Sequence, residues 1–142
     1  PVFEKLAQNL YICASTLAQH AALACFHDES LAIYEQRREA FRQRRDYIVP
    51  ALQDIGLHVP VMPDGAFYVY ADCSAHADDS SAFASELLER IYVSVVPGKD
   101  FGLHQPQRYL RLSYATAIER LQEAVARLAA YLPQRDRAAS AG

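Results

Sequence analysis

The sequence predicts an α+β fold in which a small, mostly antiparallel sheet has helices packed on one face. Residues 1–55 carry apolar side chains at the three- and four-residue spacings of helices. Residues 57–70 and 92–115 instead contain short stretches with the two-residue alternation of half-buried strands. Helical spacing appears between these stretches, at residues 80–91, and returns after residue 117.

The first two helices are expected to be short. Apolar side chains at helical spacing indicate one helix over residues 2–10. Ser15 or Thr16 is a candidate cap for a second, alanine-rich helix that ends near Cys25. This second helix is nearly apolar, so another part of a protein should cover it on more than one side.

A long third helix is expected over about residues 30–55. Asp28 or Ser30 caps its start, and Gly56 supplies the left-handed backbone that commonly ends a helix. Its apolar side chains form one stripe, which consists of Leu31, Tyr34, Phe41, Ile48, Leu52 and Ile55.

The arginines of this third helix do not indicate a nucleic-acid surface. They alternate with acidic residues at helical neighbour spacings, which is typical of a solvated, ion-paired face. The whole chain has 14 basic and 17 acidic residues and a net charge of -3, which favours neither nucleic acid nor an anionic membrane as a partner. The arginines are Arg37, Arg38, Arg42, Arg44 and Arg45, and the acids are Glu35, Glu39 and Asp46.

A hairpin is expected to follow this helix. Residues 57–61 alternate as a strand, residues 63–65 indicate a turn, and residues 67–70 return as a second strand. Tyr68 and Tyr70 are interpreted as aromatic residues that pack on the sheet and keep their polar tips accessible.

The remaining elements alternate between helix and strand, and the last residues are polar. The expected order is a helix opened by Ser80 or Ser81 and ending near Ile91, a strand over residues 92–96, a turn at Pro97-Gly98, a strand over residues 109–115, a helix over residues 118–132, and a frayed tail over residues 134–142.

One cation stands in the otherwise apolar last strand. Alternation places Leu110 and Leu112 on the core side and Arg111 on the other side, where its guanidinium can reach a cleft. A guanidinium binds a carboxylate through two parallel, charge-assisted hydrogen bonds. Arg111 is therefore a candidate carboxylate-binding residue, and the alternative is an ion pair with a structural acid such as Asp72 or Asp100.

Four motifs occur in a fixed order along the chain. They are S-x-x-x-Q-x-A-A-L at residues 15–23, P-x-G-A-F-Y at 63–68, V-V-P-G-x-x-F-G at 95–102 and Y-L-R-L-S-Y-A at 109–115. This ordered set covers nearly the whole chain and resembles the C-terminal part of the class I/II aminotransferases, fold-type-I enzymes that use pyridoxal phosphate.

The resemblance implies a small C-terminal domain. Residues 1–30 would be helices of the interdomain region, and residues 31–133 the small-domain core. Arg111 occupies the position of the family's arginine that binds the α-carboxylate of the substrate. Phe101 lies on the loop that borders the substrate, although it could equally be a core anchor.

The cofactor is expected to lie outside this chain. Chemistry with pyridoxal phosphate needs a lysine amine held beside phosphate-binding groups. Lys5 and Lys99 are interpreted as exposed residues, and neither matches the family's lysine motif. A Gly-rich phosphate cradle is also missing from the sequence. No catalytic or cofactor-binding residue is therefore assigned to this chain, which is expected to be inactive alone.

The resemblance implies that the complete enzyme transfers an amino group from an amino acid to a 2-oxo acid with pyridoxal phosphate. Expected partners are these substrates, the large domain of the same enzyme and a second copy in a homodimer. Two alternatives remain open, namely a non-catalytic carboxylate-binding module and a protein-interaction module built from the same domain.

Cysteine and histidine usage indicates an ordinary cytoplasmic protein. Cys13, Cys25 and Cys73 are odd in number and lack C-x-x-C spacing, which favours free thiols over a disulfide framework or a zinc site. The five histidines form no H-x-x-x-H pair, so a metal site is not expected. Neither an apolar run of about 20 residues nor a secretory signal is recognised.

Overall fold

The computed structural model describes the backbone of residues 1–140 and the side chains of residues 1–135. It divides the chain into two compact units, Pro1–Glu39 (unit 1) and Ala40–Gly142 (unit 2). Helix α3 (Asp28–Asp54) contributes residues to both units.

Unit 1 contains helices α1 (Val2–Leu10) and α2 (Thr16–Ala24) and the start of α3. The predicted cap of α2 is confirmed, because the Ser15 hydroxyl accepts a hydrogen bond from the amide of Ala18 at 3.3 Å. No side chain of these first two helices is buried, and Leu17 is 84% exposed. The apolar surface that was expected to need a cover is therefore open within the described chain.

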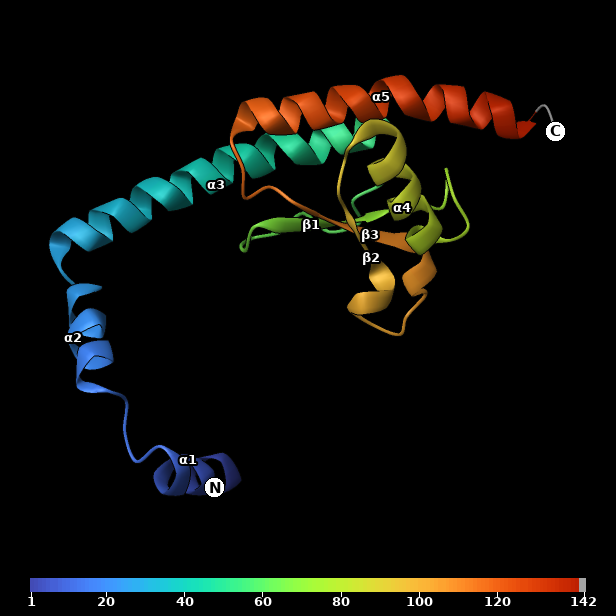
Figure 1. The fold of residues 1–142 in the computed structure, drawn as a ribbon. Coiled ribbons are helices and arrows are strands. Elements are labelled where there is room, and N and C mark those ends of the chain that lie inside the picture. The colour runs from blue at the N-terminus through green and yellow to red at the C-terminus, as the bar shows by residue number, and fades with distance from the viewer. Residues whose placement is uncertain (141–142) are drawn as a thin grey trace. The chain divides into compact units, whose positions relative to one another are not determined.

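Unit 2 is built on a three-stranded antiparallel sheet (Figure 1). Its strands are β1 (Tyr68–Asp72), β2 (Val96–Pro97) and β3 (Tyr109–Ser113), with β3 in the centre. The register pairs Tyr70 with Arg111. Helices α4 (Ser80–Ile91) and α5 (Ile118–Ser140) lie with the end of α3 on one side of the sheet, as the predicted α+β fold requires.

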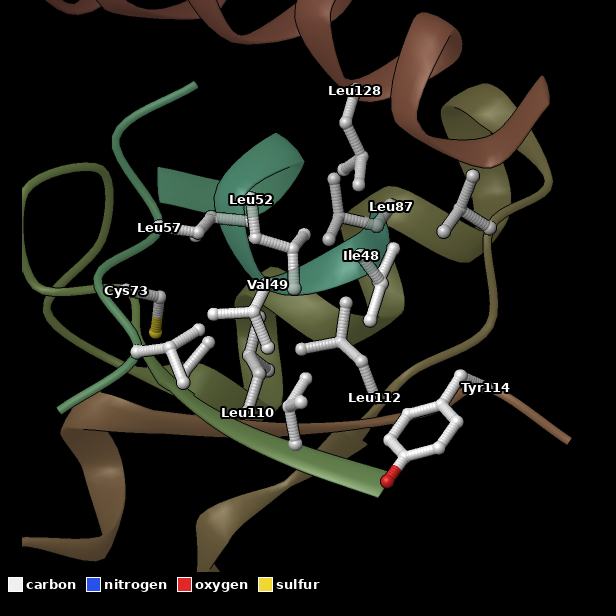
Figure 2. Close-up of a cluster of buried hydrophobic side chains, with 14 of the residues drawn as sticks. Ile48, Val49, Leu52, Leu57, Cys73, Leu87, Leu110, Leu112, Tyr114 and Leu128 are labelled. Atoms are coloured by element: carbon white, nitrogen blue, oxygen red, sulfur yellow. The ribbon is translucent and has the colours of Figure 1, made fainter. Parts of the chain in front are cut away.

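The core fills the space between this sheet face and the helices. Figure 2 shows Leu110 and Leu112 of β3 among side chains of α3 and α4 such as Leu52 and Leu87. All four are buried. Burying each of these side chains stabilises the fold by roughly 1.5–3 kcal/mol relative to exposure. The opposite sheet face carries the alternate residues of β1 and β3, which stay partly exposed.

The predicted ion-paired face of α3 is confirmed. In unit 1, Arg38 pairs with Glu35 at 2.7 Å. In unit 2, Asp46 pairs with Arg42 at 3.0 Å and with Arg45 at 2.7 Å. The helix ends before Gly56, whose φ of +84° is the left-handed conformation expected there.

The predicted hairpin of residues 57–61 and 67–70 is confirmed only as a single antiparallel bridge and not as a two-stranded ladder. In residues 57–61 only His58 forms a bridge, and it does so with Asp72. Strand β1 instead pairs along its length with β3. Pro60 and Pro63 lack amide donors, which explains why this segment cannot continue a ladder.

The strand predicted over residues 92–96 is shorter than expected and shifted. Tyr92 has a φ of +57°, and the Val93 amide bonds to the Leu87 carbonyl at 3.3 Å. These contacts form a left-handed helix cap, so residues 92 and 93 terminate α4 rather than starting a strand. Pairing with β3 is left to Val96 and Pro97.

Helix α5 continues through Pro133 to Ser140, beyond the expected end near residue 132. Arg135 explains part of this extension, because it bonds to Glu86 of α4 at 2.7 Å and to the carbonyl of His76. A frayed tail was expected over residues 134–142. For the residues after Arg135 this stays a prediction, and residues 141–142 lie outside the described part.

Candidate carboxylate-binding site

Arg111 lies in the central strand β3, on the sheet face away from the helices. Its neighbours Leu110 and Leu112 are buried in the core, so the two-residue alternation turns Arg111 to the other face. There its side chain is half-buried. The predicted orientation of this arginine is confirmed by the strand geometry.

Two aromatic rings hold the guanidinium of Arg111. Its central carbon lies 4.1 Å from the ring centroid of Phe101 and 5.2 Å from that of Tyr68. Among the described residues, no oxygen atom accepts a hydrogen bond from this guanidinium, and neither Asp72 nor Asp100 forms an ion pair with it. The side chain therefore keeps its charge and its donors available for an anion.

Asp72, one of the acids considered for Arg111, pairs with Arg108 instead. The Arg108 Nη2 donates to the carboxylate at 2.6 Å, and the Ser74 amide donates to it at 2.8 Å. Burial by itself raises the pKa of Asp72, but the hydrogen bonds from Ser74 and Arg108 outweigh it and lower the pKa below the usual range. This pair is part of the fold.

The loop that carries Phe101 is fixed at several points. It follows the short 3-10 helix η1 (Gly98–Asp100), in which Lys99 pairs with Asp79 at 2.6 Å. Gly98 is buried, and a Cβ atom there would lie 2.4 Å from the Pro106 carbonyl oxygen. Only glycine fits this close approach, so Phe101 projects from a constrained backbone.

Phe101, whose ring contacts Arg111, also lines a surface hollow of about 490 Å³. Tyr70 and Tyr109, whose stacked rings are 4.8 Å apart, form part of its wall. The full lining is Pro60, Tyr70, Phe101, Gly102, Leu103, His104 and Tyr109. The arginine and the hollow thus share one neighbour, Phe101, and Arg111 itself is not among the lining residues.

The described residues do not fit a covalently held pyridoxal phosphate. Lys99 donates to Asp79 in an ion pair, while Lys5 lies on α1 and is exposed. Nor do residues 1–135 contain three or more His, Cys, Asp or Glu side chains grouped to hold a metal ion. No helix of the described chain is long and apolar enough to cross a membrane.

The two predicted site residues, Arg111 and Phe101, are brought together, and Phe101 is not a core anchor because it is 46% exposed. The contact between Tyr68 and Arg111 was not predicted from the sequence. Its two-residue spacing from Tyr70 indicated the correct sheet face, but the register with β3 that brings it near Arg111 has no signal in the sequence.

Comparisons with known proteins agree with this architecture. A model of the family "Aminotransferase class I and II" matches residues 2–128. The valine–pyruvate aminotransferase of Mycobacterium tuberculosis is 35% identical over 128 residues, which are 90% of this chain and 33% of that protein. The aspartate/prephenate aminotransferase of Thermus thermophilus is 44% identical over 119 residues, covering 82% of this chain and 30% of that protein.

Solved structures show the same fold. The crystal structure of an aminotransferase from Mycobacterium tuberculosis superposes with a TM-score of 0.84 at 35% identity, and the match covers 91% of this chain and 33% of that chain. The chain therefore spans about a third of the length of the relatives it matches.

Proposed function

The chain belongs to the aminotransferase class I and II family, and from that premise we propose that it is the C-terminal small domain of a pyridoxal-phosphate-dependent aminotransferase. In the complete enzyme an amino group passes from an amino acid to a 2-oxo acid. The role proposed for this chain is to bind the α-carboxylate of either substrate through Arg111.

The surroundings of Arg111 carry this proposal. Its guanidinium lies against the Phe101 and Tyr68 rings and has no acidic partner among the described residues. An anion can therefore bind these donors without displacing an acidic partner in the protein. A carboxylate matches the planar fork of an arginine in shape and charge, and the bond fixes the orientation of the substrate.

The proposal places the cofactor and the Schiff-base lysine in the large domain. Pyridoxal phosphate, when bound, supplies the electron sink that makes amino-group transfer possible. This chain contributes binding and orientation of the carboxylate, and its movement with the small domain would help to close the site to water. We further propose that the parent is a cytoplasmic homodimer and that the isolated chain is inactive.

The assignment is tested by reduction with borohydride in the presence of pyridoxal phosphate, followed by intact-mass measurement. The complete protein is expected to gain one cofactor per chain, on a lysine outside these 142 residues, and the isolated chain to gain no stoichiometric adduct. A site-specific adduct on Lys5 or Lys99 would overturn the assignment of the cofactor to the large domain. A complete protein that binds no cofactor would favour a non-catalytic carboxylate-binding module instead.

A further inference from the structure

We propose that Tyr68 is a positioning residue for substrate binding, which acts through Arg111. The proposal rests on the proposed function of Arg111 and adds a second residue to it. The Tyr68 ring, together with that of Phe101, holds the guanidinium where its N–H donors meet the incoming carboxylate.

The need for such a residue follows from the arginine itself. An arginine side chain loses rotamer entropy when it is held in one conformation. Among the described residues Arg111 has no oxygen acceptor that could hold it. An acid beside Arg111 would compete with the substrate carboxylate for the guanidinium. Asp72 illustrates such an acid, because it occupies the guanidinium of Arg108 at 2.6 Å. Aromatic rings attract the cation without supplying a competing anion.

The sheet register explains how Tyr68 reaches this position. Tyr70 is directly opposite Arg111, and Tyr68 is opposite Ser113, so Tyr68 is a diagonal neighbour of the arginine on the same sheet face. Aromatic side chains bridge that diagonal separation. Phe101 approaches from the loop after η1, more than 30 residues away along the chain from Tyr68. Two distant segments therefore converge on one guanidinium.

The ring of Tyr68, rather than its hydroxyl, makes the contact. The hydroxyl of Tyr70 donates to the Gly98 carbonyl, and that of Tyr114 donates to the carbonyls of Gly65 and Ala66. In the described part of the chain the Tyr68 hydroxyl has no hydrogen-bond partner, whereas its ring contacts Arg111 and packs edge-on against Phe67. Phenylalanine at position 68 should therefore preserve the contact with Arg111, whereas an aliphatic residue should remove it.

The test is a double-mutant cycle in the complete enzyme, read as kcat/KM for an amino acid and as Kd for a 2-oxo acid. Tyr68→Leu is expected to weaken both by about 3- to 30-fold, the range of a cation–π contact. Tyr68→Phe should keep both kcat/KM and Kd close to the values of the parent enzyme. In an Arg111→Ala background the Tyr68→Leu change should have no further effect, because a positioning residue has nothing left to position.

Tyr92→Leu is the matched control, since Tyr92 is also aromatic but is exposed at the end of α4, does not contact Arg111 and does not line the hollow beside Phe101. Phe101→Leu serves as a second probe of the same contact if Tyr68→Leu does not fold. Equal losses for Tyr68→Leu with and without Arg111 would overturn the inference, as would an equal loss for Tyr92→Leu. If Arg111→Ala alone has no effect, the proposed function of Arg111 fails, which is a separate result.

Discussion

Arg108 and Arg111 are three residues apart in the chain, and their neighbours differ in kind. Arg108 lies beside Asp72 and Ser74, and its ion pair joins two segments of the fold. Arg111 lies beside two rings that stabilise positive charge but accept no strong hydrogen bond. From the sequence, Arg111 could be proposed as a carboxylate-binding residue, with an ion pair to Asp72 or Asp100 left open as the alternative. The sequence could not assign Asp72, because the partner of an acid depends on the register between strands.

Gly98 gives a prediction at the scale of one residue. A Cβ atom there would meet the Pro106 carbonyl oxygen at 2.4 Å and the Tyr70 hydroxyl at 2.5 Å. Gly98→Ala is therefore expected to lower the free energy of unfolding by about 1–3 kcal/mol, the usual cost of overpacking. Urea denaturation measures this change. Gly65→Ala is the control, since nothing lies within 4 Å of its Cβ position, and equal effects of the two substitutions would contradict the tight packing at Gly98.

At the scale of elements, periodicity identified the helices well and the strand partners poorly. The spacing of apolar residues marked all five helices, and the two-residue alternation marked the buried face of β3. Alternation states which face a residue occupies but not which strand lies beside it. For this reason the sequence did not predict the pairing of β1 with β3. The predicted start of α4 at Ser80 is confirmed, while its cap was not predicted: the Asp79 side chain accepts hydrogen bonds from the amides of Ser81 and Ala82.

Asp79 gives a prediction for the junction between α4 and η1. The hydrogen bond from Lys99, followed by those from the amides of Ala82 and Ser81, lowers the pKa of Asp79 from 3.8 to about 2. Because the folded-state pKa is depressed, this stabilisation is present above about pH 4 and is lost as the pH falls through about 2. Asp79→Asn keeps a capping oxygen but removes the charge.

The free energy of unfolding of Asp79→Asn should therefore lie below that of the parent chain at pH 7, and the difference should shrink between pH 4 and 2. Urea denaturation at several pH values measures both. A difference between the two chains that stays constant over this range would show that the charge of Asp79 does not stabilise the junction.

At the scale of the whole molecule, the most informative feature is the exposed apolar surface of unit 1. Phe3 is 88% exposed, and α1 and α2 bury no side chain within the described chain. Soluble proteins seldom leave large contiguous apolar patches open. The chain also spans only about a third of the length of the relatives it matches. We therefore propose that the large domain or the second subunit of the parent enzyme covers this surface.

The central claim is that Arg111 binds the substrate carboxylate, and the most direct measurement compares substrates with and without that group. In the complete enzyme, kcat/KM is measured for an amino acid and for the amine that remains after its carboxylate is removed. Arg111→Ala should reduce the value for the amino acid by about 30- to 5,000-fold, which corresponds to 2–5 kcal/mol for an unpaired charge. Arg111→Lys should also reduce it, because lysine lacks the planar fork.

The value for the amine should change only a few-fold in both variants, and the absorbance of the bound cofactor should persist. These outcomes together would show that the arginine acts on the carboxylate and nowhere else. If Arg111→Ala left kcat/KM for the amino acid within a few-fold of the parent enzyme, or reduced the values for amino acid and amine equally, the carboxylate-binding role of Arg111 would be contradicted.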